Sequence, residues 1–122
     1  MKREFGACTF SLVSEIRPDS DTEGNIRRFM PQDQYDNRKN LPLHAYGNGP
    51  FCGFRIPSDL HKEGVYVLTV DKGVVYVGER IDLSLRYNAG YGQIAPRNCY
   101  KGGQRTNCRI NNSLQPQWNL KR

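Results

Sequence analysis

Two short runs of strand-favouring residues, separated by three residues, constrain the fold of this chain more than any other feature. The runs are 64–70 (GVYVLTV) and 74–78 (VVYVG), with Asp71-Lys72-Gly73 between them. Val, Tyr, Leu and Thr favour strands, and a glycine at the end of the connection accepts the positive φ that a tight turn requires. The spacing therefore predicts an antiparallel β-hairpin.

The register of this hairpin brings two tyrosines together. With a three-residue connection, Tyr66 faces Gly78 and Leu68 faces Tyr76 across the two strands. Tyr66 and Tyr76 then lie on one face of the hairpin as diagonal neighbours, within reach of each other. A shift of one residue would move one ring to the other face, so this pair depends on the register.

A short helix is expected directly after the hairpin. Asp82 is a suitable N-cap and Gly90 a suitable C-terminal stop, which predicts a helix of about two turns. We expect it to cross back over the hairpin, with Leu85 and Ile81 facing the sheet. Arg86 would then lie at the edge of the groove that contains the tyrosines.

The remaining sequence predicts little regular structure. Residues 1–60 carry few secondary-structure signals, and short strands are expected only at 10–16 and 51–56. A chain of 122 residues suits one main domain, and its hydrophobic fraction of 37% predicts a small core. We therefore expect an α+β fold: a small antiparallel β-sheet with short flanking helices and long loops.

The sequence favours a soluble, cytoplasmic protein. It contains no run of about twenty apolar residues, so no membrane span is expected. Its N-terminus lacks the apolar stretch of a signal peptide. No pair of cysteines has the C-x-x-C spacing of a zinc site, so we expect reduced, partly buried thiols and no zinc. These cysteines are Cys8, Cys52, Cys99 and Cys108.

The charge distribution predicts a nucleic-acid partner. The formal net charge is +6, and residues 83–122 contain no Asp or Glu. A long basic segment without acids fits a polyanion, because its cations replace the counterions of the phosphates. An ordinary solvated basic loop is the alternative. The candidate nucleic-acid contacts are Arg97, Asn98, Lys101, Arg105, Asn107 and Arg109.

The hairpin and the residues after it also carry groups that suit phosphodiester chemistry. Arg86 supplies fixed positive charge to a phosphate, and Tyr66 and Tyr76 supply phenols. A tyrosine becomes a useful base only where a cation lowers its pKa from about 10. A divalent cation normally supplies the remaining charge stabilisation and requires oxygen ligands, usually with a carboxylate.

These residues resemble the motifs of a known nuclease family. Gly64-Val65-Tyr66 and Tyr76-Val77-Gly78 resemble the two half-motifs of the GIY-YIG nuclease superfamily, with valine in place of isoleucine. Arg86 matches the family arginine on the following helix. Residues 44–54 (HAYGNGPFCGF) and 90–111 (GYGQIAPRNCYKGGQRTNCRIN) resemble a branch that includes restriction-type endonucleases.

The resemblance covers roughly residues 41–122 and leaves 1–40 as a partly irregular N-terminal extension. It implies a central antiparallel sheet of about three strands. It also implies DNA cleavage with one divalent cation, Mg²⁺ or Mn²⁺.

The family pattern implies a role for each matching residue. Tyr66 would act as general base or orient the attacking water, and Tyr76 would assist it or hold the phosphate. Arg86 would stabilise the transition state. Gly64 and Gly78 would be structural at the site, Gly78 by leaving room beneath the tyrosines.

The chain departs from the family pattern in two places. Many members have a histidine about four residues after the arginine, where this chain has Gly90 followed by Tyr91. The family's metal-binding glutamate lies on a later helix, whereas no acid follows Asp82 here, and the connection from residue 112 to Trp118 is short. The domain is therefore expected to lack a segment near residue 112. Glu79 is the nearest acid and a weak metal candidate.

Three functions follow from the sequence. The first is a DNA endonuclease of GIY-YIG type with weak or absent cleavage and retained DNA affinity. The second is a non-catalytic nucleic-acid-binding module on the same scaffold, whose binding would survive EDTA. The third is a small basic protein–protein adaptor, which would show no salt-dependent affinity for DNA.

Overall fold

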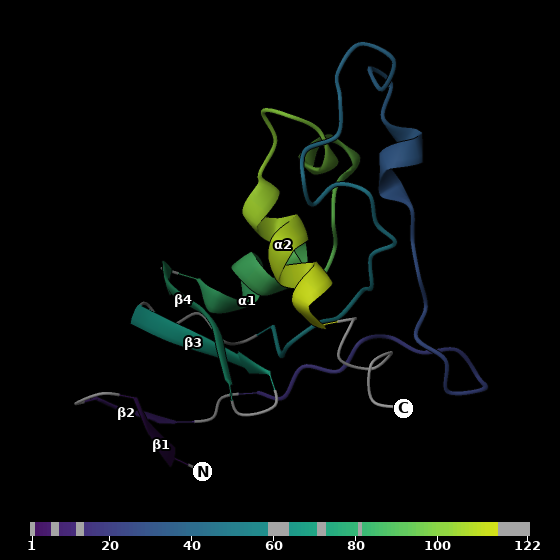
Figure 1. Ribbon diagram of the computed structural model, residues 1–122. Helices are drawn as coiled ribbons and strands as arrows, with labels where there is room; N and C mark the ends of the chain where they lie inside the picture. Colours follow the sequence, from purple (N-terminus) through teal and green to yellow (C-terminus); the bar gives the residue numbers. More distant parts are fainter. Residues whose placement is uncertain are drawn as a thin grey trace.

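A β-hairpin, covered on one face by helical turns, is the centre of the fold in this computed structural model (Figure 1). The structure describes residues 2–5, 8–11, 14–58, 64–70, 73–80 and 82–114. It is a small α+β fold, as the sequence predicts. Its elements are the strands β1 (Lys2–Phe5), β2 (Cys8–Ser11), β3 (Gly64–Val70) and β4 (Gly73–Arg80), the 3₁₀ turns η1 (Pro31–Gln34) and η3 (Pro96–Cys99), the π-helical turn η2 (Tyr87–Tyr91), and the helices α1 (Leu83–Arg86) and α2 (Arg105–Leu114).

The β3–β4 hairpin has the predicted register around the tyrosines. Tyr66 pairs with Gly78, and Leu68 pairs with Tyr76, in an antiparallel arrangement. The predicted three-residue connection is wrong, because Gly73 is already the first residue of β4. An irregularity in the strand pairing just after Leu68 compensates for the shorter connection, since a β-bulge places one extra residue in one strand without changing the pairs before it.

The two faces of this hairpin differ in burial. Leu68 is 6% exposed, and Tyr66 and Tyr76 pack against the same core from the same face. Side chains alternate along a strand, so the residues between them point the other way. Val65 and Val77 on that second face are each 56% exposed. The tyrosine face is therefore the inner face of the hairpin.

The segment after the hairpin forms the predicted short helix, but it ends later than predicted. Asp82 is the N-cap, and its Oδ1 accepts a hydrogen bond from the backbone N of Leu85 at 3.0 Å. α1 continues directly into the wider turn η2, which ends where Gly92 donates its N–H to the carbonyl of Tyr87 at 2.7 Å. The predicted stop at Gly90 is wrong, because Gly90 lies inside η2.

The predicted orientation of this helix is also wrong. Leu85 is 64% exposed and does not face the sheet, whereas Ser84 is 3% exposed. The Asp82 cap fixes where the helix begins, and that start turns Ser84 inward, where its hydroxyl is 3.2 Å from the carbonyl of Ser58. Ile81, the other residue expected on the sheet, lies outside the described residues.

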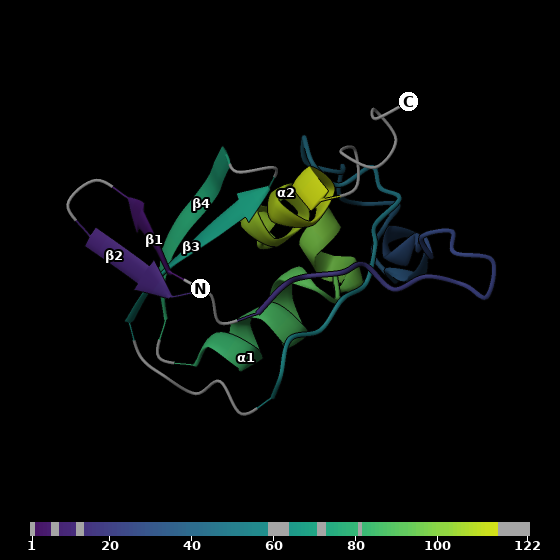
Figure 2. The same cartoon turned by 90° about the horizontal axis from the view of Figure 1, so that it is seen from below.

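Helix α2 lies between the β3–β4 hairpin and the segment around η1 in both views (Figures 1 and 2). It contributes to two apolar clusters and therefore joins them into one core. The first contains Cys52, Phe54, Ile56, Leu68, Tyr87, Tyr91, Ile110 and Leu114. The second contains Phe51, Ile94, Cys99, Tyr100 and Cys108.

Two buried asparagines bind the extended segment 51–56 to the helices. Asn111 of α2 donates to the carbonyls of Cys52 and Tyr91, both at 2.8 Å, and accepts from the Cys52 N–H at 3.0 Å. Asn88 of η2 accepts from the N–H of Ile56 at 2.7 Å and donates to its carbonyl at 2.9 Å. These side chains satisfy buried backbone groups that a neighbouring strand would otherwise satisfy.

This explains why the predicted strands and sheet differ from the structure. Residues 51–56 are extended but form only an isolated bridge, between Phe51 and Phe29. Amide side chains occupy the backbone groups of Cys52 and Ile56, and main-chain groups of the loops at Asp19 and Gly92 bond Gly53 and Phe54. Of the strand expected at 10–16, Phe10 and Ser11 belong to β2, which pairs with β1; residues 14–16 are not in a strand, and 12–13 lie outside the described residues. Among the described residues the sheets β1–β2 and β3–β4 have two strands each, so the expected sheet of about three strands is not found there.

Some residues assigned to the N-terminal extension contact the core, and the chain is helical at residue 112, near which a segment is expected to be missing. Tyr100 donates its hydroxyl to the carbonyl of Gln32 at 2.7 Å, and Gln32 donates its amide to the carbonyl of Asn48 at 2.6 Å. Residue 112 lies within α2, which continues to Leu114, and Trp118 lies outside the described residues. No helix in the described ranges is long and apolar enough to cross a membrane.

Replacing Asn111 with alanine is expected to lower the free energy of unfolding by about 3–5 kcal/mol, because three buried backbone groups would lose their partner. Urea denaturation of the full chain measures this. Asn112→Ala is the matched control, since Asn112 makes a single 3.3 Å bond to the carbonyl of Tyr46 and should cost less than about 1 kcal/mol. Equal losses in the two variants would contradict the role of Asn111.

Candidate functional site: a tyrosine cluster beside Arg86

Four tyrosines meet on the inner face of the hairpin, and we call Tyr66, Tyr76, Tyr87 and Tyr91 the tyrosine cluster. The ring centroids of Tyr87 and Tyr91 are 4.9 Å apart and those of Tyr66 and Tyr87 are 5.3 Å apart, both edge to face. Tyr66 and Tyr76, the predicted pair, are 6.1 Å apart. Edge-to-face contacts of this kind stabilise aromatic groups and fix their orientation.

A short hydrogen bond and a glycine fix the position of the Tyr66 hydroxyl. The hydroxyls of Tyr66 and Tyr91 are 2.6 Å apart, and Tyr91 is fully buried. A Cβ atom on Gly78 would lie 2.5 Å from the hydroxyl of Tyr66 and 2.8 Å from the ring of Tyr76. Only glycine therefore fits beneath these two rings. Gly64, by contrast, has open space around it, and its φ of 151° is what favours glycine there.

Arg86 lies against the cluster because of the π-helical turn. Its Cζ is 4.3 Å from the centroid of the Tyr91 ring, which is a close cation–π contact. In an α-helix the residue above Arg86 would be Gly90, but the extra residue in η2 places Tyr91 there instead. The Nε atom of Arg86 is buried and has no hydrogen-bond partner among the described residues.

Two amide side chains from the start of α2 hold the other side of Arg86. Gln104 accepts hydrogen bonds from Arg86 Nη1 at 3.4 Å and from Asn107 Nδ2 at 3.1 Å. Asn107 is 1% exposed, and its Oδ1 has no partner within the described ranges. A Cβ on Gly90 would lie 3.2 Å from Arg86 Nη1, so a glycine permits this close approach.

Burial controls the protonation of the phenols. Burial, then the hydrogen bond to Tyr91 and the neighbouring phenols, raise the pKa of Tyr66 well above its usual value of 10, and the opposing effect of Arg86 is smaller. Burial likewise raises the pKa of Tyr87. Tyr66 is therefore a neutral hydrogen-bond donor at neutral pH. Of its two predicted roles, this favours orienting a water over acting as general base.

The predicted nucleic-acid contacts fall into two groups. Arg109 of α2 lies over the Tyr76 ring, with its Cζ 5.6 Å from the centroid, and so belongs beside the cluster. Arg97 and Arg105 lie over other rings, those of Tyr35 and Tyr46, at 5.8 and 5.3 Å. These arginines are therefore spread from the hairpin to the η1 side of α2.

The remaining predicted contacts are partly occupied by the protein itself. Lys101 is exposed and available. Asn98 uses its side-chain oxygen to accept the N–H of Gln104 at 3.2 Å, and its carbonyl contacts His44 and Cys108. Asn98 therefore has a structural role and contributes less to a ligand surface than the sequence predicts.

The residues around the cluster do not fit a resident Mg²⁺ or Mn²⁺. They supply phenols, amides and a guanidinium rather than the carboxylates that these cations prefer. Glu79 pairs with Val65 and therefore belongs to the outer face of the hairpin, opposite Tyr66 and Tyr76. The described part of the chain contains no group of three or more His, Cys, Asp or Glu side chains arranged to hold a metal ion.

Tyr91, Tyr87 and Gln104 are the site residues that sequence reasoning missed. Tyr91 stands five residues after Arg86, and a regular α-helix would place it away from the arginine. The glycines on both sides of Tyr91 are the one signal of an unusual turn at this point. Comparisons of the chain with protein-family models, with curated proteins and with solved structures find no match.

The raised pKa of Tyr87 makes stability depend on alkaline pH. The folded protein retains a proton that the unfolded chain releases above pH 10. The contribution of Tyr87 to the free energy of unfolding is therefore complete below that pH and is lost as the pH rises above it. Tyr87→Phe removes this contribution, and its stability should fall less steeply than that of the wild type from about pH 9 to about pH 11. Urea denaturation across this range measures the two slopes.

Tyr46→Phe is the matched control for this substitution, because Tyr46 lies outside the tyrosine cluster. A Tyr87→Phe slope as steep as that of the wild type would show that burial does not hold the proton on Tyr87 in the folded state.

Proposed function

We propose that the protein binds DNA through a backbone phosphate at Arg86 and acts on it as a phosphodiesterase of the GIY-YIG type, with weak cleavage. One observation carries this proposal: the Arg86 guanidinium, held over the Tyr91 ring beside phenol hydroxyls at the inner edge of the hairpin, forms no ion pair with the residues that the structure describes. A guanidinium without a carboxylate partner is suited to a phosphate oxygen, which it would bind through its exposed end.

The geometry around Arg86 suits an oxyanion such as a phosphate. The Tyr91 ring and Gln104 fix the plane of the guanidinium, which leaves it oriented before a ligand arrives. Planar, pre-oriented guanidinium groups bind phosphate oxygens in a bidentate manner. With Tyr91 as the donor in the bond between the two hydroxyls, Tyr66, kept neutral by burial, donates its single O–H to the same phosphate.

The surface around this site supports a polyanionic ligand. The sequence from residue 83 to residue 114 contains no acid, so Arg97, Lys101, Arg105 and Arg109 have no carboxylate close in sequence. Arg97, Arg105 and Arg109 lie over aromatic rings, which hold their side chains in place while leaving their charge uncompensated. Such a surface attracts DNA through counterion release and loses affinity as salt rises.

Weak cleavage follows from the chemistry of the site. The described residues contain no cluster of three or more side chains able to hold a divalent cation near Arg86, and Tyr66 keeps its proton. Phosphate binding through Arg86 requires neither group. A second function, a non-catalytic DNA-binding module, is favoured specifically by the placement of Glu79 on the outer face of the hairpin.

Two assays on the full chain test this proposal. Fluorescence anisotropy with duplex DNA in EDTA measures binding, and plasmid nicking with Mg²⁺ or Mn²⁺ measures cleavage. Arg86→Gln should weaken DNA binding about tenfold or more, because a hydrogen bond to a charged group contributes roughly 1.5–3 kcal/mol. Arg17→Gln, the same charge change in an exposed surface pair with Glu15, is the matched control and should bind like the wild type.

The outcomes separate the candidate functions. Slow nicking that Tyr66→Phe and Arg86→Gln abolish supports the phosphodiesterase. DNA binding in EDTA with no nicking under any condition supports the non-catalytic module. Absence of salt-dependent DNA affinity would reject both and leave the adaptor.

A further inference from the structure

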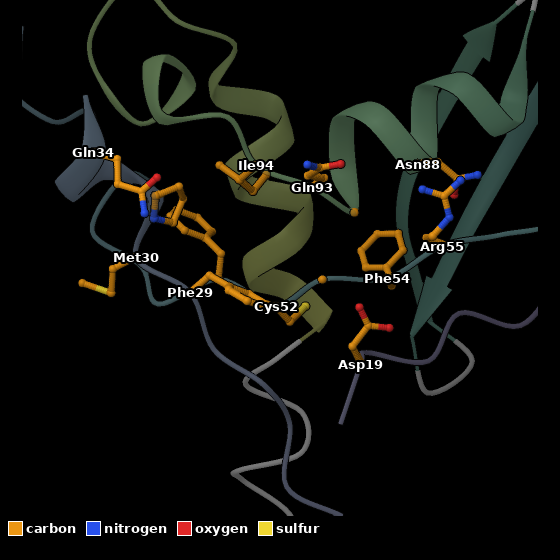
Figure 3. Close-up of a pocket in the computed structure, with 14 residues that line it drawn as sticks. Asp19, Phe29, Met30, Gln34, Cys52, Phe54, Arg55, Asn88, Gln93 and Ile94 are labelled. Atoms are coloured by element: carbon orange, nitrogen blue, oxygen red, sulfur yellow. The ribbon is translucent and has the colours of Figure 1, made fainter. Parts of the chain in front are cut away.

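A cavity of about 410 Å³, whose lining residues Figure 3 draws, lies beside the turn η2 and has no residue of the tyrosine cluster in its lining. Asn88 of η2 and Gly92 at its end line this cavity, whereas Tyr87 and Tyr91 of the same turn contact the hairpin tyrosines. The volume lies within the usual range of small-molecule sites. The cavity is therefore large enough for a ligand of its own, separate from a phosphate at Arg86.

The walls of the cavity offer flat apolar surfaces. The rings of Phe29 and Phe54 and the thioether of Met30 belong to its lining, with Ile94 beside them (Figure 3). Phe29 is 49% exposed and Met30 is 44% exposed, although both side chains are strongly apolar. Aromatic rings and thioethers contact planar heterocycles favourably, and stacking on such rings is the usual way in which proteins hold a base.

A carboxylate without a partner stands at the edge of these apolar walls. The main chain of Asp19 is fixed by hydrogen bonds to Gly53 at 2.7 Å and from Arg27 at 2.8 Å. Its carboxylate forms no hydrogen bond or ion pair with the residues that the structure describes. The nearby amide of Asn88 already bonds both backbone groups of Ile56, and Asp19 is the acidic residue of the lining, with both carboxylate oxygens open to a ligand.

A glycine keeps the carboxylate and the aromatic ring accessible to one ligand. A Cβ atom on Gly53 would lie 3.1 Å from Asp19 Oδ2 and 3.5 Å from Cε2 of Phe29. Any larger side chain would therefore occupy the space between the two groups. Because both atoms lie within about 3.5 Å of this point, the Asp19 oxygen and an edge atom of the Phe29 ring are close enough to contact the same small heterocycle.

We propose that this cavity binds a guanine base. An ionised carboxylate only accepts hydrogen bonds, and its two oxygens accept best from two adjacent donors. On its Watson–Crick edge guanine presents two adjacent N–H donors, at N1 and at the exocyclic amine. Adenine and cytosine present one donor beside an acceptor, and thymine presents one donor between two acceptors. Asp19 would therefore select guanine, while Phe29 would contact the face of the base.

The proposal does not depend on phosphate binding at Arg86. Arg55, which is exposed and belongs to the cavity lining, offers a cation for the phosphate of the same nucleotide. The guanine has two chemical sources, a free guanine nucleotide or an unpaired guanine in a DNA strand. Both present the same edge to Asp19, so the experiment needs one arm for each source.

Calorimetry with free nucleotides is the first arm. Guanosine monophosphate should bind about tenfold more tightly than inosine monophosphate, which lacks the exocyclic amine and so loses one charged hydrogen bond. Asp19→Asn should remove this preference, whereas Asp36→Asn, the same change on an exposed turn, should keep it. Phe29→Ala should weaken binding of both nucleotides alike, because stacking does not distinguish them.

Single-stranded oligonucleotides are the second arm, with one guanine or one hypoxanthine at the same position. A guanine preference that Asp19→Asn removes, seen in the oligonucleotides, assigns the base to DNA. The same preference seen only with mononucleotides assigns it to a free nucleotide. Arg86→Gln should lower the affinity for oligonucleotides without changing the preference for guanine over hypoxanthine in mononucleotides or in oligonucleotides. This result would separate the guanine site from the phosphate site at Arg86. The proposal is overturned if neither arm shows a guanine preference, or if the preference survives in folded Asp19→Asn.

Discussion

The hydrogen bonds of Asn111 hold together the three segments on which the rest of the molecule depends. This buried amide joins α2 to the extended chain at Cys52 and to the end of η2 at Tyr91. A buried amide of this kind is stabilising only where each of its groups has a partner, which restricts how the three segments can be arranged. The positions of η2, and therefore of Arg86 and the tyrosine cluster, follow from this restriction.

The turn η2 separates two sites with different chemistry. Tyr87 and Tyr91 face the hairpin and hold Arg86 beside buried phenols. Asn88 and Gly92 line the cavity at which the Asp19 carboxylate has no hydrogen bond or ion pair with the described residues. Positive charge with neutral donors suits a phosphate, whereas a carboxylate beside aromatic rings suits the donor edge of a base. One turn of chain thus separates the two proposed sites, one for a phosphate and one for a base.

Sequence reasoning predicted the elements that depend on local chemistry. The pairing of Tyr66 with Gly78 follows from strand propensity and alternation, and the Asp82 cap follows from the need of a helix start for an acceptor. The π-helical turn has no comparable local signal, because it is stabilised by tertiary packing of Tyr91. The sequence therefore located Arg86 but missed the ring on which it lies.

The sheet was overpredicted for a related reason. Residues 51–56 have the composition of a strand, but Asn111 and Asn88 satisfy the backbone groups of Cys52 and Ile56, and these asparagines lie more than thirty positions away in the chain. Long-range contacts between a side chain and the backbone leave no periodic pattern in the sequence. Leu85 was predicted to face the sheet but is exposed, because the Asp82 cap sets the residue at which the helix begins and therefore which of its residues face inward.

The salt dependence of DNA affinity tests the central claim most directly, because it counts phosphates neutralised by the protein. The logarithm of the binding constant falls linearly with the logarithm of the salt concentration, with a slope of about −0.9 for each neutralised phosphate. If Arg86 contacts a phosphate, Arg86→Gln should reduce the magnitude of the wild-type slope by about 0.9, whereas Arg17→Gln should leave it unchanged. Equal slopes for Arg86→Gln and the wild type would contradict the account.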